Sequence, residues 1–337
     1  MKKKILYIGN KLSKHGSTTT SIETLGEFLE NEGYEVFYSS SKKNKTLRML
    51  GMIFSTIRYA YKVNFVLIDT YSTQNFWYAF IISQLCRIFK LKYITKLHGG
   101  DLPNRVEKSR FFCDLIFNNA YIVSAPSDYL IDSFKKAGYK NVMHIPNTID
   151  LSNYKFTNRE LLEPNLLWVR SFSAIYNPKM AIKVLFELQK EYPNASLCMV
   201  GPDKDNLILE SQNLANELQV NVKFTGRLSK AEWITLAENY SIFINTTHYD
   251  NTPVSIIEAM AIGIPIVSTN VGGIPFLIQD KKEAMLVDDN AIADMVIAIK
   301  QLINNKQLSK ELISNSLKKA QSFDWKIVKL QWFEILK

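Results

Sequence analysis

The residues whose chemistry is most evident follow an apolar run, Ile242–Asn245, that predicts a strand. Thr252-Pro253 predicts that a helix starts shortly afterwards, because threonine is a good N-cap and proline suits the first helical position. The free amides of Val254 and Ser255 would then point out of the helix start. The spacing therefore predicts an anion site at the start of this helix.

Glu258 lies within the same predicted helix. It is the only charged residue between Asp250 and Asp280, and its helix is otherwise apolar. A buried carboxylate must be paired or hydrogen-bonded, because burying it bare is costly. The two oxygens could accept the two hydroxyls of a ribose. They could equally cap a neighbouring helix or pair with a core arginine, and the pattern leaves these alternatives open.

Two further candidates stand at predicted strand ends, where doubly wound sheets bind their ligands. Arg170 ends a strand predicted over Leu166–Arg170, and its fork and permanent charge suit a diphosphate. A surface salt bridge is the alternative. His98 follows a strand predicted over Tyr93–Leu97 and precedes two glycines that allow close backbone approach. A single histidine at such a position is more often structural.

Positive charge is concentrated in the first half of the chain. Residues 1–150 hold 21 Lys/Arg and 12 Asp/Glu, whereas residues 151–337 hold 20 of each. Between Lys45 and Lys62, basic residues interleave with apolar and aromatic ones, a pattern that suits a helix on an anionic membrane surface. The candidate membrane-facing cations are Lys42, Lys43, Lys45 and Arg48. Nucleic acid is the competing partner, although no RNA-binding motif is present, and a core helix with a solvated basic face is the third interpretation.

The rest of the composition excludes several classes of protein. Cys86, Cys113 and Cys198 are an odd number of widely spaced cysteines, which argues against a disulfide framework or a cysteine-based zinc site. The apolar run after the basic N-terminus is too short for a signal peptide. The run Phe76–Ile82 falls short of a membrane span. We therefore expect a cytoplasmic protein without a membrane span.

Short β-rich runs alternate with stretches of helical periodicity along the whole chain. The predicted strands are Lys4–Ile8, Glu35–Ser39, Phe65–Asp69, Tyr93–Leu97, Tyr121–Ala125, Val142–Ile145, Leu166–Arg170, Ser196–Val200, Val222–Phe224, Ile242–Asn245, Pro265–Ser268 and Met285–Val287. Continuous apolar strands joined by helices predict parallel sheets covered on both faces. The two sets of strands predict an α/β protein with two doubly wound domains, separated by the polar stretch 146–164.

The segment Asp250-x7-Glu258, followed by an apolar run that ends at Gly272-Gly-Ile-Pro275, resembles the signature of family 4 retaining glycosyltransferases. Supporting motifs occur in the expected order over nearly the whole chain: His98-Gly-Gly-Asp101, Ile145-Pro-Asn-Thr-Ile-Asp150, Met199-Val-Gly-Pro202 and Phe224-Thr-Gly226. The resemblance implies the GT-B fold, in which two Rossmann-like domains with doubly wound parallel sheets face each other across a cleft. An acceptor-binding domain would cover 1–155 and a nucleotide-sugar-binding domain 156–321, with a C-terminal helix, 322–337, crossing back to the first domain.

The resemblance also implies roles for the matching residues. Glu258 would bind the ribose of a nucleotide-sugar donor, and Asp250 would contact the sugar or support the reacting centre. Arg170 would bind the diphosphate, and His98 would contact the donor sugar from the first domain. The loop that would hold the sugar and diphosphate through its amides consists of Asn251, Thr252, Pro253, Val254 and Ser255.

Further residues would complete this donor site. Lys179, nine positions after Arg170, would supply the second cation at the diphosphate, with Arg227 or Lys230 as alternatives. Gly16, in the loop after the first strand, would let the backbone approach the diphosphate and acceptor.

The implied reaction transfers a sugar from a nucleoside-diphosphate sugar to a hydroxyl acceptor with retention at the anomeric carbon. The acceptor would be a lipid-linked or polysaccharide intermediate at the cytoplasmic membrane face, where the basic face would attach the protein peripherally. No cofactor and no metal are expected, because Asp203-Lys-Asp205 matches a metal-binding Asp-x-Asp only literally and sits in a predicted turn. A GT-B sugar-nucleotide epimerase and a non-catalytic RNA-binding protein are the alternatives.

Overall fold

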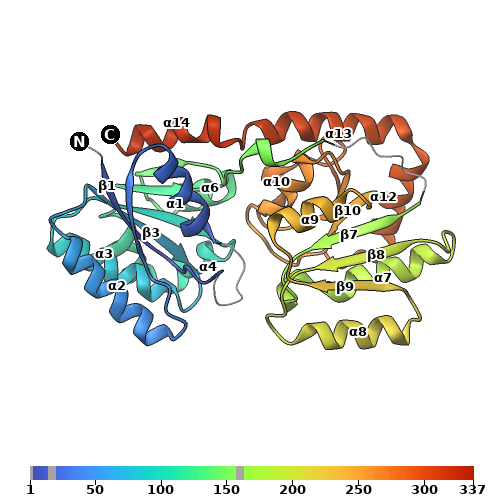
Figure 1. Cartoon of the computed structure of the whole chain (residues 1–337), viewed down its shortest axis with the longest axis horizontal. Coiled ribbons are helices and arrows are strands. Elements are labelled where there is room, and N and C mark those ends of the chain that lie inside the picture. Colours follow the sequence, from blue (N-terminus) through green and yellow to red (C-terminus); the bar gives the residue numbers. More distant parts are fainter. Residues whose placement is uncertain (1–2, 14–19, 157–162) are drawn as a thin grey trace. The chain divides into compact units, whose positions relative to one another are not determined.

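The structure is a computed structural model that describes residues 3–13, 20–156 and 163–337. Its internal contacts divide the chain into two compact units. Unit 1 comprises Met1–Asn147 and Val328–Lys337, and unit 2 comprises Thr148–Ile327. The divisions predicted from the sequence, at residues 155 and 321, differ from these. Helix α14 (Trp325–Ile335) spans the second division (Figure 1).

Unit 1 alternates strands and helices. Its elements are β1 (Lys4–Ile8), α1 (Ser21–Asn31), β2 (Glu35–Ser39), α2 (Lys45–Tyr59), β3 (Phe65–Tyr71), α3 (Phe76–Ile88), β4 (Tyr93–His98), α4 (Leu102–Lys108), α5 (Arg110–Phe117), β5 (Ile122–Ala125), α6 (Asp128–Lys136) and β6 (Val142–His144). All the strands pair in parallel, in the order β2-β1-β3-β4-β5-β6. The strand order therefore reverses between β1 and β3, and such a switch point is where doubly wound sheets bind ligands.

Unit 2 follows the same alternation. Its elements are β7 (Asn165–Val169), α7 (Pro178–Gln189), β8 (Ser196–Val200), α8 (Leu207–Glu217), β9 (Val222–Gly226), α9 (Lys230–Ala237), β10 (Ile242–Asn245), α10 (Val254–Ala261), β11 (Ile266–Thr269), α11 (Ile274–Leu277), β12 (Met285–Val287), α12 (Ile292–Asn304) and α13 (Lys306–Gln321). The parallel sheet has the order β12-β11-β10-β7-β8-β9. Its switch point lies between β10 and β7, the arrangement of a Rossmann fold.

Both faces of the unit 2 sheet are covered, as the unbroken apolar strands predict. Consecutive residues of a strand point to opposite faces. Leu166 and Trp168 belong to one buried apolar cluster, whereas Leu167 between them belongs to another. The α/β class with two doubly wound parallel sheets is thereby confirmed. In the described part of the chain, no helix combines the length and hydrophobicity needed to cross a bilayer.

Candidate functional site

The switch point of unit 2 brings three polar side chains together at the carboxyl edge of the sheet. Arg170 directly follows β7, Asn245 ends β10 and Ser268 lies in β11. The Asn245 amide donates from Nδ2 to Oγ of Ser268 at 2.9 Å, and its Oδ1 accepts from Nε of Arg170 at 3.2 Å. Asn245 is fully buried. The guanidinium is therefore held at the position where Rossmann folds bind their ligands.

Arg170 forms an ion pair with Asp250. Nη2 of Arg170 lies 2.8 Å from Oδ2 of Asp250, and only 12% and 16% of the two side chains are exposed. The guanidinium also lies over the ring of Tyr176, 5.0 Å from its centroid. Burial raises the pKa of the Tyr176 phenol, and the nearby Asp250 charge raises it further. Two residues that the sequence analysis placed in the reaction are thus paired with each other.

The loop that carries Asp250 packs against two glycines. Gly272 has a φ of 55°, and a methyl group on it would overlap the carbonyl oxygen of Asp250. A methyl group on Gly273 would overlap the carbonyl oxygen of Asn251. The amide of Gly273 donates to the Asp250 carbonyl at 2.8 Å. This close approach explains why a pair of glycines follows the acidic signature.

The predicted start of helix α10 needs a correction of one residue. Pro253 is the N-cap, with φ −65° and ψ 118°, and Val254 is the first helical residue. Thr252 is therefore outside the helix rather than its cap. Ser255 lies in the first turn and is buried, and its hydroxyl has no hydrogen-bond partner within the described residues.

Glu258 has two partners in the structure, both at the same oxygen. Tyr154 donates its hydroxyl to Oε1 at 2.8 Å, and Nζ of Lys230 lies 2.8 Å from Oε1. Only 6% of the Glu258 side chain is exposed. Burial, followed by the Glu258 charge, raises the pKa of Tyr154 so far that its phenol remains a hydrogen-bond donor. The buried carboxylate is thus satisfied, but by a tyrosine and a lysine rather than by a core arginine.

The structure gives the other proposed cations different surroundings. Nζ of Lys179, in α7, pairs with Oε2 of Glu210 in α8 at 2.6 Å, and both side chains are about half exposed. Arg227 is an exposed residue just after β9. Lys230, the first residue of α9, is the lysine that the structure brings to Glu258.

The carboxylates of the Asp-x-Asp match, Asp203 and Asp205, accept hydrogen bonds from nearby loop and helix residues. Asp203 accepts from the amide of Leu207, the first residue of α8, at 2.9 Å. Asp205 accepts from the Ser173 hydroxyl at 2.5 Å and from the amide of Ala174 at 3.1 Å. These hydrogen bonds, led by that from Ser173, lower the pKa of Asp205. Across residues 3–13, 20–156 and 163–337, no group of three or more His, Cys, Asp or Glu side chains could hold a metal ion.

The switch point of unit 1 holds a second buried polar cluster, around Asp69 of β3. Oδ1 of Asp69 lies 2.8 Å from Nε2 of His98 and accepts from the Tyr7 hydroxyl at 3.1 Å. A carboxylate only accepts hydrogen bonds, so the neutral His98 ring donates through Nε2 and leaves Nδ1 as an acceptor. Burial lowers the pKa of His98, which keeps the ring neutral near pH 7. His98 also stacks on Tyr71, with ring centroids 4.8 Å apart.

The sequence motif indicates His98 but not its partner, Asp69. An acidic residue inside the predicted strand Phe65–Asp69 was the available signal, because a charge in a buried strand needs a partner. A methyl group on Gly9 would overlap Oδ2 of Asp69, so the glycine after β1 makes room for this carboxylate. Gly16, the glycine that the sequence analysis selected in the same loop, lies outside the described residues.

The predicted basic face needs a second correction. Lys42, Lys43 and Lys45 are exposed, but Arg48 is 5% exposed and turns inward. Nη1 of Arg48 donates to Oδ1 of Asn10 at 2.7 Å, and Nη2 donates to the carbonyl of Lys43 at 3.0 Å. Arg48 therefore stabilises the loop after β1 and does not belong to a surface that a membrane could contact.

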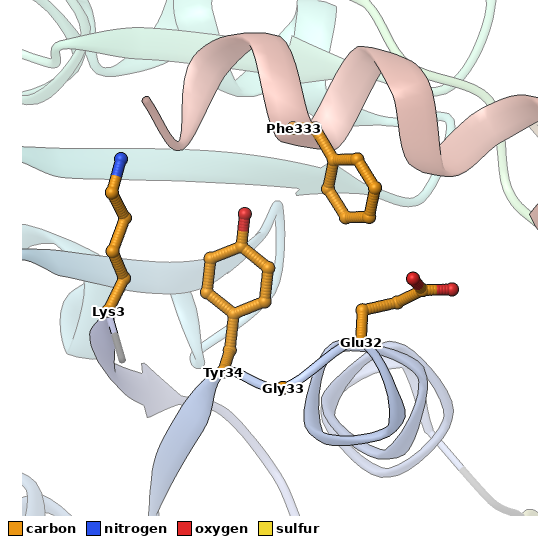
Figure 2. Close-up of a pocket in the computed structure, with 5 residues that line it drawn as sticks. All are labelled: Lys3, Glu32, Gly33, Tyr34 and Phe333. Atoms are coloured by element: carbon orange, nitrogen blue, oxygen red, sulfur yellow. The ribbon is translucent and has the colours of Figure 1, made fainter. Parts of the chain in front are cut away.

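A pocket of about 270 Å³ lies in unit 1, at the opposite end of the strands from the Asp69 cluster. Figure 2 shows Lys3, Tyr34 and Phe333 around it, with Glu32 at the end of α1. Lys3 precedes β1 and Tyr34 precedes β2, so the pocket is at the amino ends of these strands. Doubly wound sheets bind ligands at the carboxyl ends. The pocket marks instead where the C-terminal segment packs on the sheet.

Two Rossmann-like units, each with buried polar side chains at its switch point, define a protein of the GT-B class. Residues 154–319 match the model of the family described as glycosyl transferases group 1. Unit 2, which contains this segment, thus carries a group 1 glycosyltransferase domain.

Similar proteins agree with this assignment. An uncharacterised glycosyltransferase of Methanocaldococcus jannaschii is 22% identical over 330 residues, 95% of this chain and 90% of that protein. One of Haemophilus influenzae is 31% identical over 158 residues, 46% of this chain, and the match spans 44% of that relative, less than half its length. Among solved structures, Anabaena HepE in complex with UDP and glucose has a TM-score of 0.78 at 18% identity, with 99% of each chain covered.

Proposed function

We propose that the protein transfers a sugar from a nucleoside-diphosphate sugar to a hydroxyl acceptor, with retention at the anomeric carbon. The observation that carries this proposal is the arrangement around α10. A buried carboxylate, Glu258, lies one turn into this helix, while Arg170 lies on the neighbouring strand end next to Asp250. The anomeric carbon–diphosphate bond breaks, the bond to the acceptor oxygen forms, and the acceptor proton passes to the leaving phosphate.

The residues of unit 2 supply donor recognition in this proposal. Glu258 accepts the ribose hydroxyls, and Tyr154 and Lys230 hold its carboxylate in place. The amides of Val254 and Ser255 face the diphosphate at the helix start, together with the Ser255 hydroxyl, which has no hydrogen-bond partner among the described residues. A helix N-terminus stabilises the negative charge that grows on a leaving diphosphate.

Arg170, Asp250 and His98 act on the diphosphate and the sugar in this proposal. Arg170 neutralises the diphosphate, and its ion pair with Asp250 fixes the guanidinium before the donor binds. His98, neutral and oriented by Asp69, contacts the sugar through Nδ1. No metal enters this mechanism, because the cations and helix amides supply the positive charge. HepE, a protein with a similar fold, has been solved with UDP and glucose, which supports a nucleotide-sugar donor here.

The proposed acceptor is a lipid-linked or polysaccharide intermediate at the cytoplasmic face of a membrane. The basic character of residues 1–150 supports it, because the net charge of the chain, +9, equals the excess of 21 Lys/Arg over 12 Asp/Glu in that half. An anionic lipid surface attracts such a face. The protein would therefore be a cytoplasmic enzyme that associates peripherally with the membrane.

A thermal-shift panel tests the donor site. UDP, GDP, ADP and CMP, each with and without Mg²⁺, are added to the wild type, Glu258→Ala and Glu258→Gln. We expect one diphosphate to raise the melting temperature without metal, since a ligand at 100 times its Kd adds about 2.7 kcal/mol of stability. Glu258→Gln keeps an acceptor for Tyr154 and loses most of the effect, and Glu258→Ala loses all of it.

Glu210→Ala is the matched control, because it removes an exposed carboxylate of unit 2 that pairs with Lys179. It should keep the full nucleotide shift. If no nucleotide stabilises the wild type, or if Glu258→Ala responds like the wild type, the donor site is wrong. A shift that requires Mg²⁺ would contradict the metal-free mechanism and direct attention to Asp203 and Asp205.

A further inference from the structure

Helix α2 is anchored in unit 1 by one well-packed face. Met52 and Thr56 are fully buried on it, and Tyr59 stacks on Phe37 with ring centroids 4.3 Å apart. Figure 1 shows α2 beside α3, and the hydroxyl of Tyr78 in α3 donates to the carbonyl of Lys45 at 3.2 Å. These contacts fix the rotation of the helix, so the face that points outward is defined.

The outward face of α2 is apolar. At 100° per residue its four large apolar side chains fall within an arc of about 80°. They are 50–62% exposed, and Tyr61, just after the helix, is 87% exposed. The members of this apolar stripe are Leu47, Leu50, Phe54, Ile57 and Tyr61. A solvated helix face normally carries polar residues, and a continuous exposed apolar face marks an interaction site.

The charges around the stripe have one sign. Residues 36–68 contain six Lys/Arg and no Asp or Glu. Arg48 is buried, and the five exposed cations are Lys42, Lys43 and Lys45 before or at the start of α2, and Arg58 and Lys62 at its end. Trp77, in the adjacent α3, is 40% exposed. Exposed cations therefore flank the apolar stripe at both ends, with an aromatic ring on the neighbouring helix.

We propose that the apolar stripe of α2 inserts into the interfacial region of an anionic lipid bilayer, with α2 lying in the membrane plane. The aliphatic and aromatic side chains enter the acyl boundary, while the exposed cations contact lipid headgroups. This proposal rests on the proposed function for its biological setting, since it places unit 1 at the surface that would hold a lipid-linked acceptor. It replaces Arg48, which the sequence analysis assigned to the membrane, with side chains that the structure exposes.

Other occupants account for only part of these observations. An RNA strand would neutralise the cations but leave Leu47, Leu50 and Ile57 in water, because nucleic acids offer stacking and phosphates rather than an aliphatic phase. A second copy of this chain would cover the stripe but bring five cations against the same five. A bilayer with anionic headgroups covers the apolar side chains and matches the positive charge at once.

Vesicle flotation tests the proposal with the full chain. The probes are phosphatidylcholine vesicles with and without phosphatidylglycerol, at low and high salt. We expect the wild type to float with the anionic vesicles. The double variant Leu50→Ser/Phe54→Ser should bind them about tenfold more weakly at either salt concentration, because less apolar area enters the lipid. Lys42→Gln/Lys43→Gln should weaken binding chiefly at low salt.

Two matched double variants control for loss of apolar area and of charge. Leu209→Ser/Ile297→Ser removes two exposed apolar side chains of unit 2, and Lys135→Gln/Lys136→Gln removes two adjacent exposed lysines of α6. Both should bind anionic vesicles like the wild type. The proposal would be overturned if Leu50→Ser/Phe54→Ser binds anionic vesicles as well as the wild type does, or if the wild type binds no vesicles at all.

The remaining outcomes identify a different occupant. If single-stranded RNA binds more tightly than the vesicles and displaces them, the cations serve a nucleic acid. If sedimentation shows self-association that Leu50→Ser/Phe54→Ser abolishes, the stripe is an interface between copies. Either result contradicts the lipid assignment. Nucleotide thermal shifts and flotation of the wild type separate the two proposals: a nucleotide shift without flotation removes only the membrane surface, and flotation without any nucleotide shift removes only the donor site. A full nucleotide shift in Leu50→Ser/Phe54→Ser shows that its weaker flotation does not come from misfolding.

Discussion

Lys96 is a charged side chain inside unit 1, on the same strand as His98. It is 4% exposed, and Nζ lies 3.3 Å from Oδ1 of Asn147. Burial lowers its pKa from 10.5 to about 8, although the charge of Asp69 opposes the shift. Lys96 also contributes to lowering the pKa of His98. The protonation state of this cluster therefore changes within an experimentally accessible range.

The lowered pKa of Lys96 predicts that unit 1 gains stability as the pH rises. Above about pH 8 the folded state has released a proton that the unfolded chain keeps up to its ordinary pKa, so the unfolded state binds more protons and the free energy of unfolding increases. We expect the wild type to gain about 2–3 kcal/mol relative to Lys96→Met between about pH 7 and pH 10. Urea titrations read by limited proteolysis, which separates fragments of the two units, measure this difference.

Other groups that titrate in this pH range are present in both the wild type and Lys96→Met, so their contributions to the free energy of unfolding cancel in the comparison. The pKa values of Tyr7 and Tyr71 are raised well above their usual range by burial, and both residues are common to the two proteins. Lys92→Met changes an exposed lysine just before the same strand and should show no relative gain. Stability curves of the wild type and Lys96→Met that run parallel over the whole range would refute the prediction.

At the scale of single residues, the sequence indicates which side chains need a hydrogen-bond or charge partner. It is less informative about which residue that partner is. A lone Glu258 in an apolar helix indicated a paired carboxylate, but Tyr154 is 104 positions away and only the fold brings it close. Arg48 was misplaced for a different reason. Helix α2 has apolar residues on both its inward and outward faces, so its periodicity did not define which face is buried.

At the scale of elements, the polar loops after the strands are positioned by close backbone packing. Gly201, with φ 153°, lies where a methyl group would overlap the carbonyl oxygen of Arg170. Gly272 and Gly273 perform the same role for the loop of Asp250 and Asn251. In each case, glycines in the loop after one strand contact the backbone of a loop that carries a charged residue, and so position that residue.

Gly273→Ala should therefore disturb the candidate donor site without changing any of its side chains. The φ of Gly273, −86°, is acceptable for alanine, so steric overlap with the Asn251 carbonyl is the effect being tested. We expect the loop at Asp250 to shift, and the nucleotide-dependent thermal shift to fall by at least about half, because donor amides that move lose their hydrogen bonds. The thermal-shift panel gives the measurement, with circular dichroism as a check on folding.

Gly138→Ala supplies the control for this substitution. Gly138 has φ 94° after α6, and the nearest atom to an added methyl group would be Nη2 of Arg110, 3.9 Å away. Alanine there costs backbone strain in unit 1 but should leave the nucleotide shift intact. A Gly273→Ala protein with a full nucleotide shift would show that the packing of this loop does not determine donor binding.

Strands were predicted well because each is a continuous buried apolar run. Lys4–Ile8, Ser196–Val200 and Ile242–Asn245 have the predicted limits, because each contains an apolar run with a polar residue at one end. Limits differed where polar residues continue a strand. Thus β3 extends past Asp69 to Tyr71, because Thr70 is buried in the sheet and Tyr71 pairs with His98. The N-cap of α10 is Pro253 rather than the predicted Thr252, and the loop before it packs against Gly272 and Gly273, which local capping rules do not include.

At the scale of the whole molecule, the chain ends by completing the unit in which it begins. Residues Val328–Lys337 belong to unit 1 and contribute Trp332 and Leu336, both buried. Nζ of Lys3 donates to the Leu336 carbonyl at 2.8 Å, and Nζ of Lys329 pairs with Glu32 at 2.8 Å. A helical apolar pattern predicted a terminal helix, but the sequence did not show which of its residues are buried.

This packing predicts that Trp332→Ala destabilises unit 1 selectively. Removing a fully buried tryptophan side chain costs about 3–5 kcal/mol, because apolar contacts are lost and a cavity remains. Hydrogen exchange measured by mass spectrometry should become faster in β1 and β2, which lie beside the C-terminal segment, while β8 and β10 of unit 2 keep their rates.

Leu330→Ala is the control on the same helix, since this side chain is 64% exposed, and it should leave exchange in both units nearly unchanged. Equal acceleration in β1 and β8 of Trp332→Ala would contradict selective destabilisation, because the two units would then unfold as one cooperative structure. The expected result, faster exchange confined to unit 1, would mean that the C-terminal residues stabilise the basic unit carrying α2 while the candidate donor-site residues of unit 2 fold independently of them.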